Sequence, residues 1–106
     1  MALYITLSEQ SMTAYLAGEL DHHSAKAVRE EIDETASRGC PDELVLDFQN
    51  VSFMDSSGIG LVMGRYALMQ ELGGSLRVVN MSSHIRKVMK LAGLDRLAVM
   101  EQGGKQ

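Results

Sequence analysis

The 106-residue chain carries ten basic and fourteen acidic residues, for a net charge of −4, and 45% of its residues are hydrophobic. This size and composition are typical of one compact domain over residues 1–106 with enough apolar surface for a core. The acidic balance, without a cluster of Lys and Arg, argues against nucleic acid as a partner. No apolar run approaches the roughly 20 residues that cross a bilayer, and no signal segment opens the chain, so we expect no membrane partner and a cytoplasmic location.

The first half of the chain predicts an antiparallel hairpin of two strands, followed by a helix. Apolar residues alternate with more varied neighbours over residues 3–7, and a β-compatible pattern resumes over residues 13–17. Small and apolar residues then recur at helical spacing over residues 25–36. The pattern ends near Gly39, as expected for a helix with a glycine stop.

The second half predicts two buried strands, each followed by a helix. The short apolar runs at residues 44–48 and 76–79 have the composition of buried parallel strands. Apolar positions over residues 59–69 predict a helix that ends at the glycine pair 73–74. One of the serines at 82–83 can cap a shorter helix after the second strand.

The C-terminal part completes an alternating order of strands and helices. Gly93 is expected to stop the last helix, residues 97–100 to form an edge strand, and residues 101–106 to form a flexible tail. This order predicts an α/β domain with a mixed sheet of about four to five strands and about three to four helices. The opening hairpin is antiparallel and the later strands are parallel. Right-handed crossovers bring the loops after the parallel strands to one edge of the sheet, where sites in such sheets lie.

Residues 51–60 are the most informative segment, a strand-to-helix turn that carries Asp55, Ser56, Ser57 and Gly58. Asp and Ser are preferred N-caps, because their side-chain oxygens accept hydrogen bonds from backbone N–H groups that have no partner within the helix. Since capping needs only one group, we expect Ser56 to cap and Ser57 to remain available. Asp55 is a second cap or orients the Ser57 hydroxyl. A helix N-terminus also tolerates added negative charge, so a phosphate on this turn is compatible with the helix.

A second polar turn, Asp21-His22-His23, is expected at the same edge of the sheet. Asp21 ends a strand, caps the next helix or contacts a partner, and Ser24 is an alternative cap. The histidine pair raises a metal site as an alternative. However, adjacent histidines at a helix start rarely point the same way, and no third ligand lies at suitable spacing. We therefore expect no metal.

The segments Gly-Glu-Leu-Asp-His-His at 18–23 and Ser-Phe-Met-Asp-Ser-Ser-Gly-Ile-Gly at 52–60, with Gly-Arg-Tyr at 64–66, resemble a known family. They are similar to the bacterial anti-sigma factor antagonists of the STAS domain family, above all to the sporulation type of Bacillus and its relatives. The resemblance covers nearly the whole chain and implies that Ser57 is a phosphorylation site. It also implies contacts to a partner, or support of the site, by Asp21, His22, His23, Asp55, Ser56, Gly58 and Ile59.

The resemblance implies a partner that is both an anti-sigma factor and a serine kinase. The unphosphorylated antagonist binds this partner and frees a sporulation sigma factor, the kinase uses ATP to phosphorylate Ser57 and ends the complex, and a serine phosphatase resets it. The chain itself is then no enzyme and has no cofactor, because ATP or ADP is bound by the kinase. A phosphate adds about −1.5 to −2 charge, so we expect exclusion from the partner rather than refolding.

Four questions stay open at this stage. The chain could serve a general stress response rather than sporulation. It could be a weak nucleotide-binding STAS module, although no Walker-type or Gly-x-Gly-x-x-Gly sequence is present. A hydrolase with Ser57 as nucleophile is a further alternative, but residues 54–58 lack the first glycine of a Gly-x-Ser-x-Gly elbow, and His84 is the only candidate base outside the His22-His23 pair. Relatives of the sporulation type carry further helical sequence after the last strand, so we expect a monomer with a capacity for weak self-association.

Overall fold

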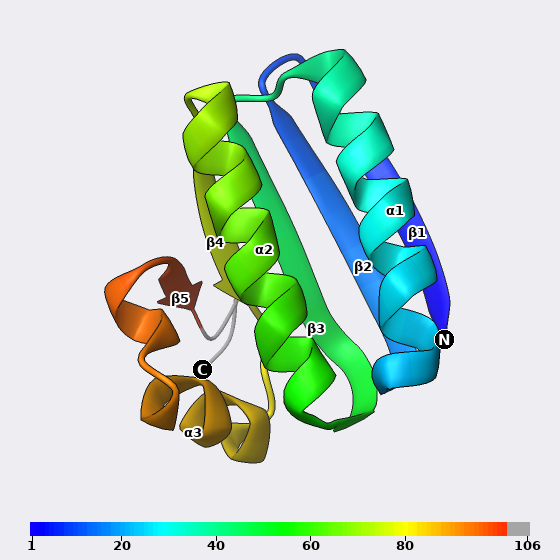
Figure 1. Cartoon of the computed structure of the whole chain (residues 1–106), viewed down its shortest axis with the longest axis vertical. Coiled ribbons are helices and arrows are strands. Elements are labelled where there is room, and N and C mark those ends of the chain that lie inside the picture. Colours follow the sequence, from blue (N-terminus) through cyan, green and yellow to red (C-terminus); the bar gives the residue numbers. More distant parts are fainter. Residues whose placement is uncertain (102–106) are drawn as a thin grey trace.

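The structure is a computed structural model, and it describes residues 1–101. Strands and helices alternate in the predicted order, with one short 3-10 helix, η1, before the last strand (Figure 1). The elements are β1 (Ala2–Leu7), β2 (Ser11–Leu20), α1 (His22–Gly39), β3 (Glu43–Met54), α2 (Ser56–Leu72), β4 (Ser75–Val79), α3 (Ser83–Leu91), η1 (Leu94–Arg96) and β5 (Val99–Glu101). None of the helices in the described part of the chain is both long enough and apolar enough to cross a membrane.

The strands form one five-stranded sheet in the order β1-β2-β3-β4-β5. Strands β1 and β2 pair antiparallel, and the other pairs are parallel, which confirms the predicted α/β fold and mixed sheet. Each parallel strand lies beside the previous one and the chain always steps in the same direction. Right-handed crossovers then place the connecting helices on one face of the sheet. Figure 1 shows α1 and α2 side by side in front of the strands.

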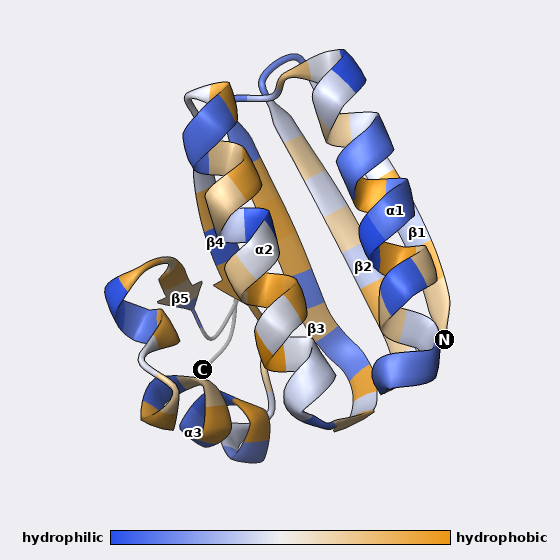
Figure 2. Cartoon of the chain, viewed as in Figure 1, coloured by the Kyte–Doolittle hydropathy of each residue, from blue (hydrophilic) through white to orange (hydrophobic). Residues whose placement is uncertain are grey.

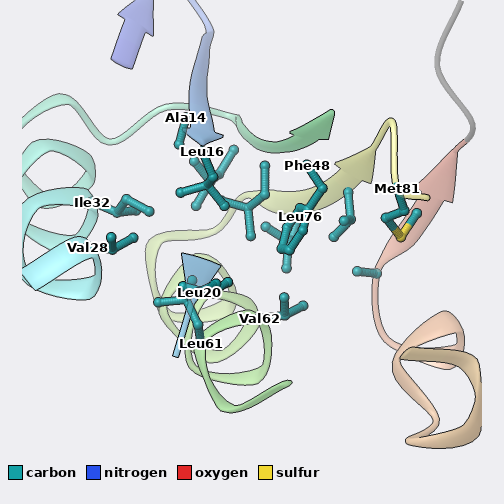
Figure 3. Packing of buried hydrophobic residues seen from close by; sticks show 14 of the residues in the cluster. Ala14, Leu16, Leu20, Val28, Ile32, Phe48, Leu61, Val62, Leu76 and Met81 are labelled. Carbon is teal, nitrogen blue, oxygen red and sulfur yellow. The ribbon is translucent and has the colours of Figure 1, made fainter. Parts of the chain in front are cut away.

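The core lies between this sheet face and the helices. Alternate residues of β2 and β3 point toward the helices and are buried, as the pleat of a strand dictates. Figure 2 shows the middle of β3 in hydrophobic colours behind α2. Figure 3 shows side chains from strands and helices converging, among them Ala14, Leu16, Val28, Ile32, Phe48, Leu61 and Val62.

Strand β3 is longer than the predicted residues 44–48, and its extension positions the serine turn. Residues 50–54 pair only with β2, because β4 pairs no further along β3 than Asp47. Polar side chains such as Gln49, Asn50 and Ser52 therefore stay exposed in a two-stranded ribbon. Because this part of the strand is not an apolar run, the sequence pattern did not predict it. The ribbon carries the end of β3 alongside the end of β2.

The sequence predicts a glycine stop for both α1 and α2, and the structure shows it at the C-terminal end of α2 only. Helix α2 stops as predicted, with Gly73 in the left-handed conformation at φ 81°. Helix α1 includes Gly39, and Cys40 takes the left-handed position at φ 45°. The next residue, Pro41, is buried and cannot continue the helix.

The last strand is shifted relative to the prediction of residues 97–100. Leu97 and Ala98 donate backbone hydrogen bonds to Leu94, so they close the turn of η1, and β5 begins at Val99. Glu101, the first residue of the predicted tail, belongs to β5 and pairs with Val79 of β4. The rest of that predicted tail, residues 102–106, lies outside the described residues.

Candidate functional site

The two polar turns meet at the carboxyl ends of β2 and β3. Leu20 and Met54 are partners in the parallel ladder, and the Asp55 N–H donates to the Leu20 carbonyl at 3.2 Å. Helices α1 and α2 start directly after these strand ends. As predicted, the Asp21 turn and the serine turn therefore form one surface.

Asp21 is the N-cap of α1. Its Oδ1 atom accepts the backbone N–H of His23 at 3.0 Å and of Ser24 at 3.1 Å. The Ser24 hydroxyl accepts the Asp21 N–H at 3.1 Å and donates to the Glu19 carbonyl at 3.0 Å, which completes a capping box. The hydrogen bond from the Ser24 backbone, helped by that from His23, lowers the pKa of Asp21 below its usual value. Asp21 is thus a fixed carboxylate at neutral pH.

Asp55, rather than Ser56, is the N-cap of α2, so the expectation for Ser56 is wrong. Asp55 has an extended backbone at the end of β3, and its Oδ1 accepts the Ser57 N–H at 2.8 Å. Because β3 continues to Met54, Ser56 becomes the first helical residue and its side chain is exposed. Neither the Ser56 nor the Ser57 hydroxyl hydrogen-bonds to the described part of the chain. Both hydroxyls are available for chemistry.

Ser57 borders a pocket of about 340 Å³ between the first turns of α1 and α2. The α1 side contributes a histidine and two cations, and the α2 side contributes small residues. The lining residues are His22, Ala25, Lys26, Arg29, Ser57, Gly60 and Leu61. Ser57 is half-buried here, whereas Ser56 points to open solvent. The pocket distinguishes the two hydroxyls and favours Ser57 as the functional one.

The rings of His22 and His23 lie against each other, with centroids 4.2 Å apart and planes inclined by 34°. The expectation that adjacent histidines at this helix start would point apart is therefore wrong. Within residues 1–101, no group of three or more His, Cys, Asp or Glu side chains could hold a metal ion. Of the two histidines, His22 lines the pocket.

Gly58 and Ile59 connect the serine turn to the core of the domain. An added Cβ at Gly58 would meet Cγ and Sδ of Met54 and lie 3.3 Å from Cδ2 of Leu20. The absence of a side chain lets the first turn of α2 pack directly on the ends of β2 and β3. Ile59 is half-buried and packs against the core. By contrast, Gly60 and Gly64 in the same helix have open space at the Cβ position.

We expect Gly58→Ala to destabilise the fold by about 1–3 kcal/mol, because the added methyl must displace the packed Met54 side chain. Gly64→Ala makes the same chemical change at an open position of α2 and is expected to stabilise by up to about 1 kcal/mol through helix propensity. Urea unfolding followed by circular dichroism measures both free energies. Equal effects of the two substitutions would contradict the packing role of Gly58.

Arg65 ties α2 to α1 behind the pocket. Its Nη2 donates to Oδ2 of Asp33 at 3.2 Å, and its Nε lies 2.8 Å from Oδ1 in an ionic contact without hydrogen-bond geometry. The Arg65 side chain is 6% exposed and that of Asp33 is 35% exposed. Burial lowers the pKa of Arg65 and raises the pKa of Asp33, and the attraction between the two charges opposes both shifts. The pair fixes the spacing of the two helices that form the pocket.

Lys26, Arg29 and Asp33 lie outside the sequence motifs, and the Gly-Arg-Tyr segment that contains Arg65 does not reveal its pairing with Asp33. His22, Lys26 and Arg29 are spaced by four and three residues, so they share one face of α1. That spacing is visible in the sequence. What the sequence does not reveal is that this face lies beside Ser57.

Comparison with known proteins identifies the family. Residues 4–101 match the family described as Mlab, STAS domain. The chain is 38% identical over 82 residues to an anti-sigma F factor antagonist of Paenibacillus polymyxa, covering 77% of this chain and 70% of that protein. It is 30% identical over 102 residues to an anti-sigma-B factor antagonist of Bacillus subtilis, covering 93% and 92%. The chain therefore belongs to the anti-sigma factor antagonists of the STAS domain family.

Two solved structures carry the same fold. The unphosphorylated form of the anti-sigma factor antagonist SpoIIAA is similar with a TM-score of 0.78 at 28% identity, covering 98% of this chain and 90% of that one. The phosphorylated form of the Bacillus cell fate determinant SpoIIAA is similar with a TM-score of 0.76 at 31% identity, covering 96% and 93%. Both forms thus match this chain almost equally well.

Proposed function

We propose that this protein is the antagonist of a partner switch in which phosphorylation of Ser57 ends its complex with an anti-sigma factor. The observation that carries the proposal is the free Ser57 hydroxyl at the pocket between α1 and α2. Asp55 accepts the Ser57 N–H, so the backbone that carries the Ser57 side chain is held in the first turn of α2. The names of its relatives supply the kind of partner, an anti-sigma factor.

In the proposed cycle the unphosphorylated protein binds an anti-sigma factor that is also a serine kinase and so releases the sigma factor. The Ser57 oxygen then bonds to the γ-phosphorus of ATP on the kinase, ADP leaves, and the hydroxyl proton passes to a base of the kinase. The product carries about −1.5 to −2 extra charge in a turn that already holds Asp55. A partner surface shaped for a neutral hydroxyl offers this dianion no counter-charge of its own and no space for it, so the complex dissociates.

The fold is expected to survive this change. A helix N-terminus has free N–H donors and a favourable dipole for a negative group. The near-equal likeness of this chain to unphosphorylated and phosphorylated SpoIIAA supports the same conclusion. We therefore propose exclusion at the contact surface as the mechanism, and a serine phosphatase as the enzyme that restores the hydroxyl.

The remaining parts of the proposal follow from this role. The protein is a substrate of other enzymes, performs no reaction itself and needs no cofactor, because the nucleotide belongs to the kinase. A regulator of sigma factors acts where transcription takes place, so we place it in the cytoplasm. It acts as a monomer. Tyr4, Tyr15 and Val99, which stay exposed away from the helices, give it a capacity for weak self-association.

A sporulation sigma factor is the proposed target, and a general stress-response factor is the second candidate. The anti-sigma F antagonists are 38% and 34% identical to this chain, against 30% and 26% for two anti-sigma-B antagonists. The B-type relative of Bacillus subtilis nevertheless covers more of this chain. Titration against a purified anti-sigma F factor and a purified anti-sigma-B factor decides between them, and tighter binding to the B type would overturn the choice.

Intact-mass analysis with fragment mapping tests the proposal directly. After incubation with ATP and the anti-sigma kinase encoded beside it, we expect one added phosphate on Ser57 and none on Ser57→Ala. Ser56→Ala is the matched control and should be modified as the unchanged protein is. A phosphate on Ser56 would correct the residue and keep the mechanism, whereas an active kinase that leaves the protein unmodified would overturn the switch.

A further inference from the structure

The pocket beside Ser57 has a cationic wall. Lys26 and Arg29 line it from α1, and Ser57 lines it from α2. Both cations are exposed, and neither belongs to an ion pair with another residue of the described chain. Three carboxylates of the helix pair are already engaged, because Asp21 caps α1, Asp55 caps α2 and Asp33 pairs with Arg65. Two cations that form no ion pair within the described residues thus share a pocket with the hydroxyl.

We propose that Lys26 and Arg29 form an internal receptor for the phosphate on Ser57, so that the modified side chain folds into the pocket between α1 and α2. This inference rests on the proposed function, since it concerns the same serine, and it specifies what holds the phosphate. A volume of about 340 Å³ is ample for a phosphate group. Ion pairs between phosphate oxygens and Lys or Arg are charge-assisted and among the stronger polar contacts.

The receptor explains how the fold tolerates the dianion and adds to the loss of the partner. Phosphate in the pocket would occupy the space between the helices and neutralise the two cations that the unmodified protein presents. The titratable groups near the hydroxyl come from both helices. On α1 they are His22, Lys26 and Arg29 in the pocket, Asp21 at the cap, and the carboxylates of Glu30 and Asp33 four residues after each cation; on α2 the group is Asp55. The carboxylates disfavour the phosphate dianion and the cations favour it. The contribution of each cation therefore has to be measured as a difference between variants.

The second pKa of the phosphate reports on the receptor. Nearby cations stabilise the dianion and lower this pKa from its ordinary value of about 6. We expect Lys26→Gln to raise it by about half a unit or more, because an opposite charge within a few ångströms shifts a pKa by about a unit. The measurement is a ³¹P NMR titration of the full chain with phosphoserine placed at position 57 by genetic encoding.

Matched variants separate the receptor from a general charge effect. Lys87→Gln removes the same charge from an exposed position on α3, away from the pocket, and should leave the phosphate pKa unchanged. Lys26→Arg keeps a cation at the wall and should retain the low pKa. Arg29→Gln is expected to act in the same direction as Lys26→Gln, although Arg29 also acts on the Asp33–Arg65 pair. Lys26 therefore gives the cleaner test.

Equal titration curves for the unchanged protein, Lys26→Gln and Lys87→Gln would overturn the receptor and leave the partner switch in place. Because the phosphoserine is encoded, the result does not depend on any kinase. Failure of the kinase to modify Ser57 would refute the proposed switch without affecting this titration. Lys26 and Arg29 are exposed, so their variants are expected to fold, and a thermal melt of each checks this.

Discussion

Ser57→Asp is expected to weaken the complex with the anti-sigma factor at least about a hundredfold, whereas Ser57→Ala retains the affinity of the unmodified protein. The aspartate places a permanent negative charge beside the pocket, at the proposed contact surface. Asp55, two residues earlier, already carries a negative charge there. A hundredfold loss of affinity corresponds to about 2.7 kcal/mol of binding free energy. Burying one uncompensated charge at an interface costs at least this much. Isothermal titration calorimetry with the purified anti-sigma factor measures both affinities.

The neighbouring hydroxyl gives the matched control. Ser56→Asp adds the same charge one residue away, on a side chain that points to solvent rather than into the pocket. We expect it to lose much less affinity than Ser57→Asp. Equal binding by Ser57→Asp and Ser57→Ala would rule out charge exclusion, and equal losses at positions 56 and 57 would mean that the pocket plays no part.

Asp33→Ala is expected to destabilise the fold by about 3–5 kcal/mol, more than Arg65→Met does, although both substitutions break the same ion pair. The asymmetry follows from burial. The Arg65 side chain is 6% exposed, so removal of Asp33 leaves a buried guanidinium without a counter-charge. The Asp33 side chain is 35% exposed, so water can solvate its carboxylate after Arg65 is removed. We expect only about 1–2 kcal/mol for Arg65→Met, because the methionine still fills much of the space.

A double-mutant cycle by urea unfolding tests this asymmetry. The double variant Asp33→Ala with Arg65→Met is expected to be close in stability to Arg65→Met alone, because no uncompensated charge remains in it. If Arg65→Met proved the more damaging single change, the pair would matter through the packing of the arginine rather than through its charge. In that case the double variant would also be no more stable than Asp33→Ala.

The order of the elements could be predicted because strands and helices differ in the period of their apolar residues. The extension of β3 could not, since residues 50–54 pair with β2 alone and carry exposed polar side chains that resemble a loop. Because of the same extension, Asp55 rather than the predicted Ser56 is the N-cap of α2. Local patterns thus located the serine turn and misjudged which residue begins the helix.

The parts of the site that could not be predicted depend on contacts between distant segments. Lys26 and Arg29 resemble any charged face of a solvated helix until α1 is placed beside Ser57. Asp33 and Arg65 are 32 residues apart, and only the packing of α1 on α2 brings them together. Sequence motifs therefore located the candidate serine, whereas its electrostatic surroundings required the structure.

Three glycines in α2, at positions 58, 60 and 64, make this 17-residue helix intrinsically weak. Each glycine costs about 0.5–1 kcal/mol relative to alanine, and isolated helices of this length are marginal even with better residues. The helix therefore depends on Leu61, Val62 and Met69, which are buried against the sheet. A nascent or damaged chain would not present Ser57 on a formed turn. Under the proposed switch, we therefore expect the kinase to recognise the folded surface rather than a linear segment, so that only completely folded molecules are phosphorylated.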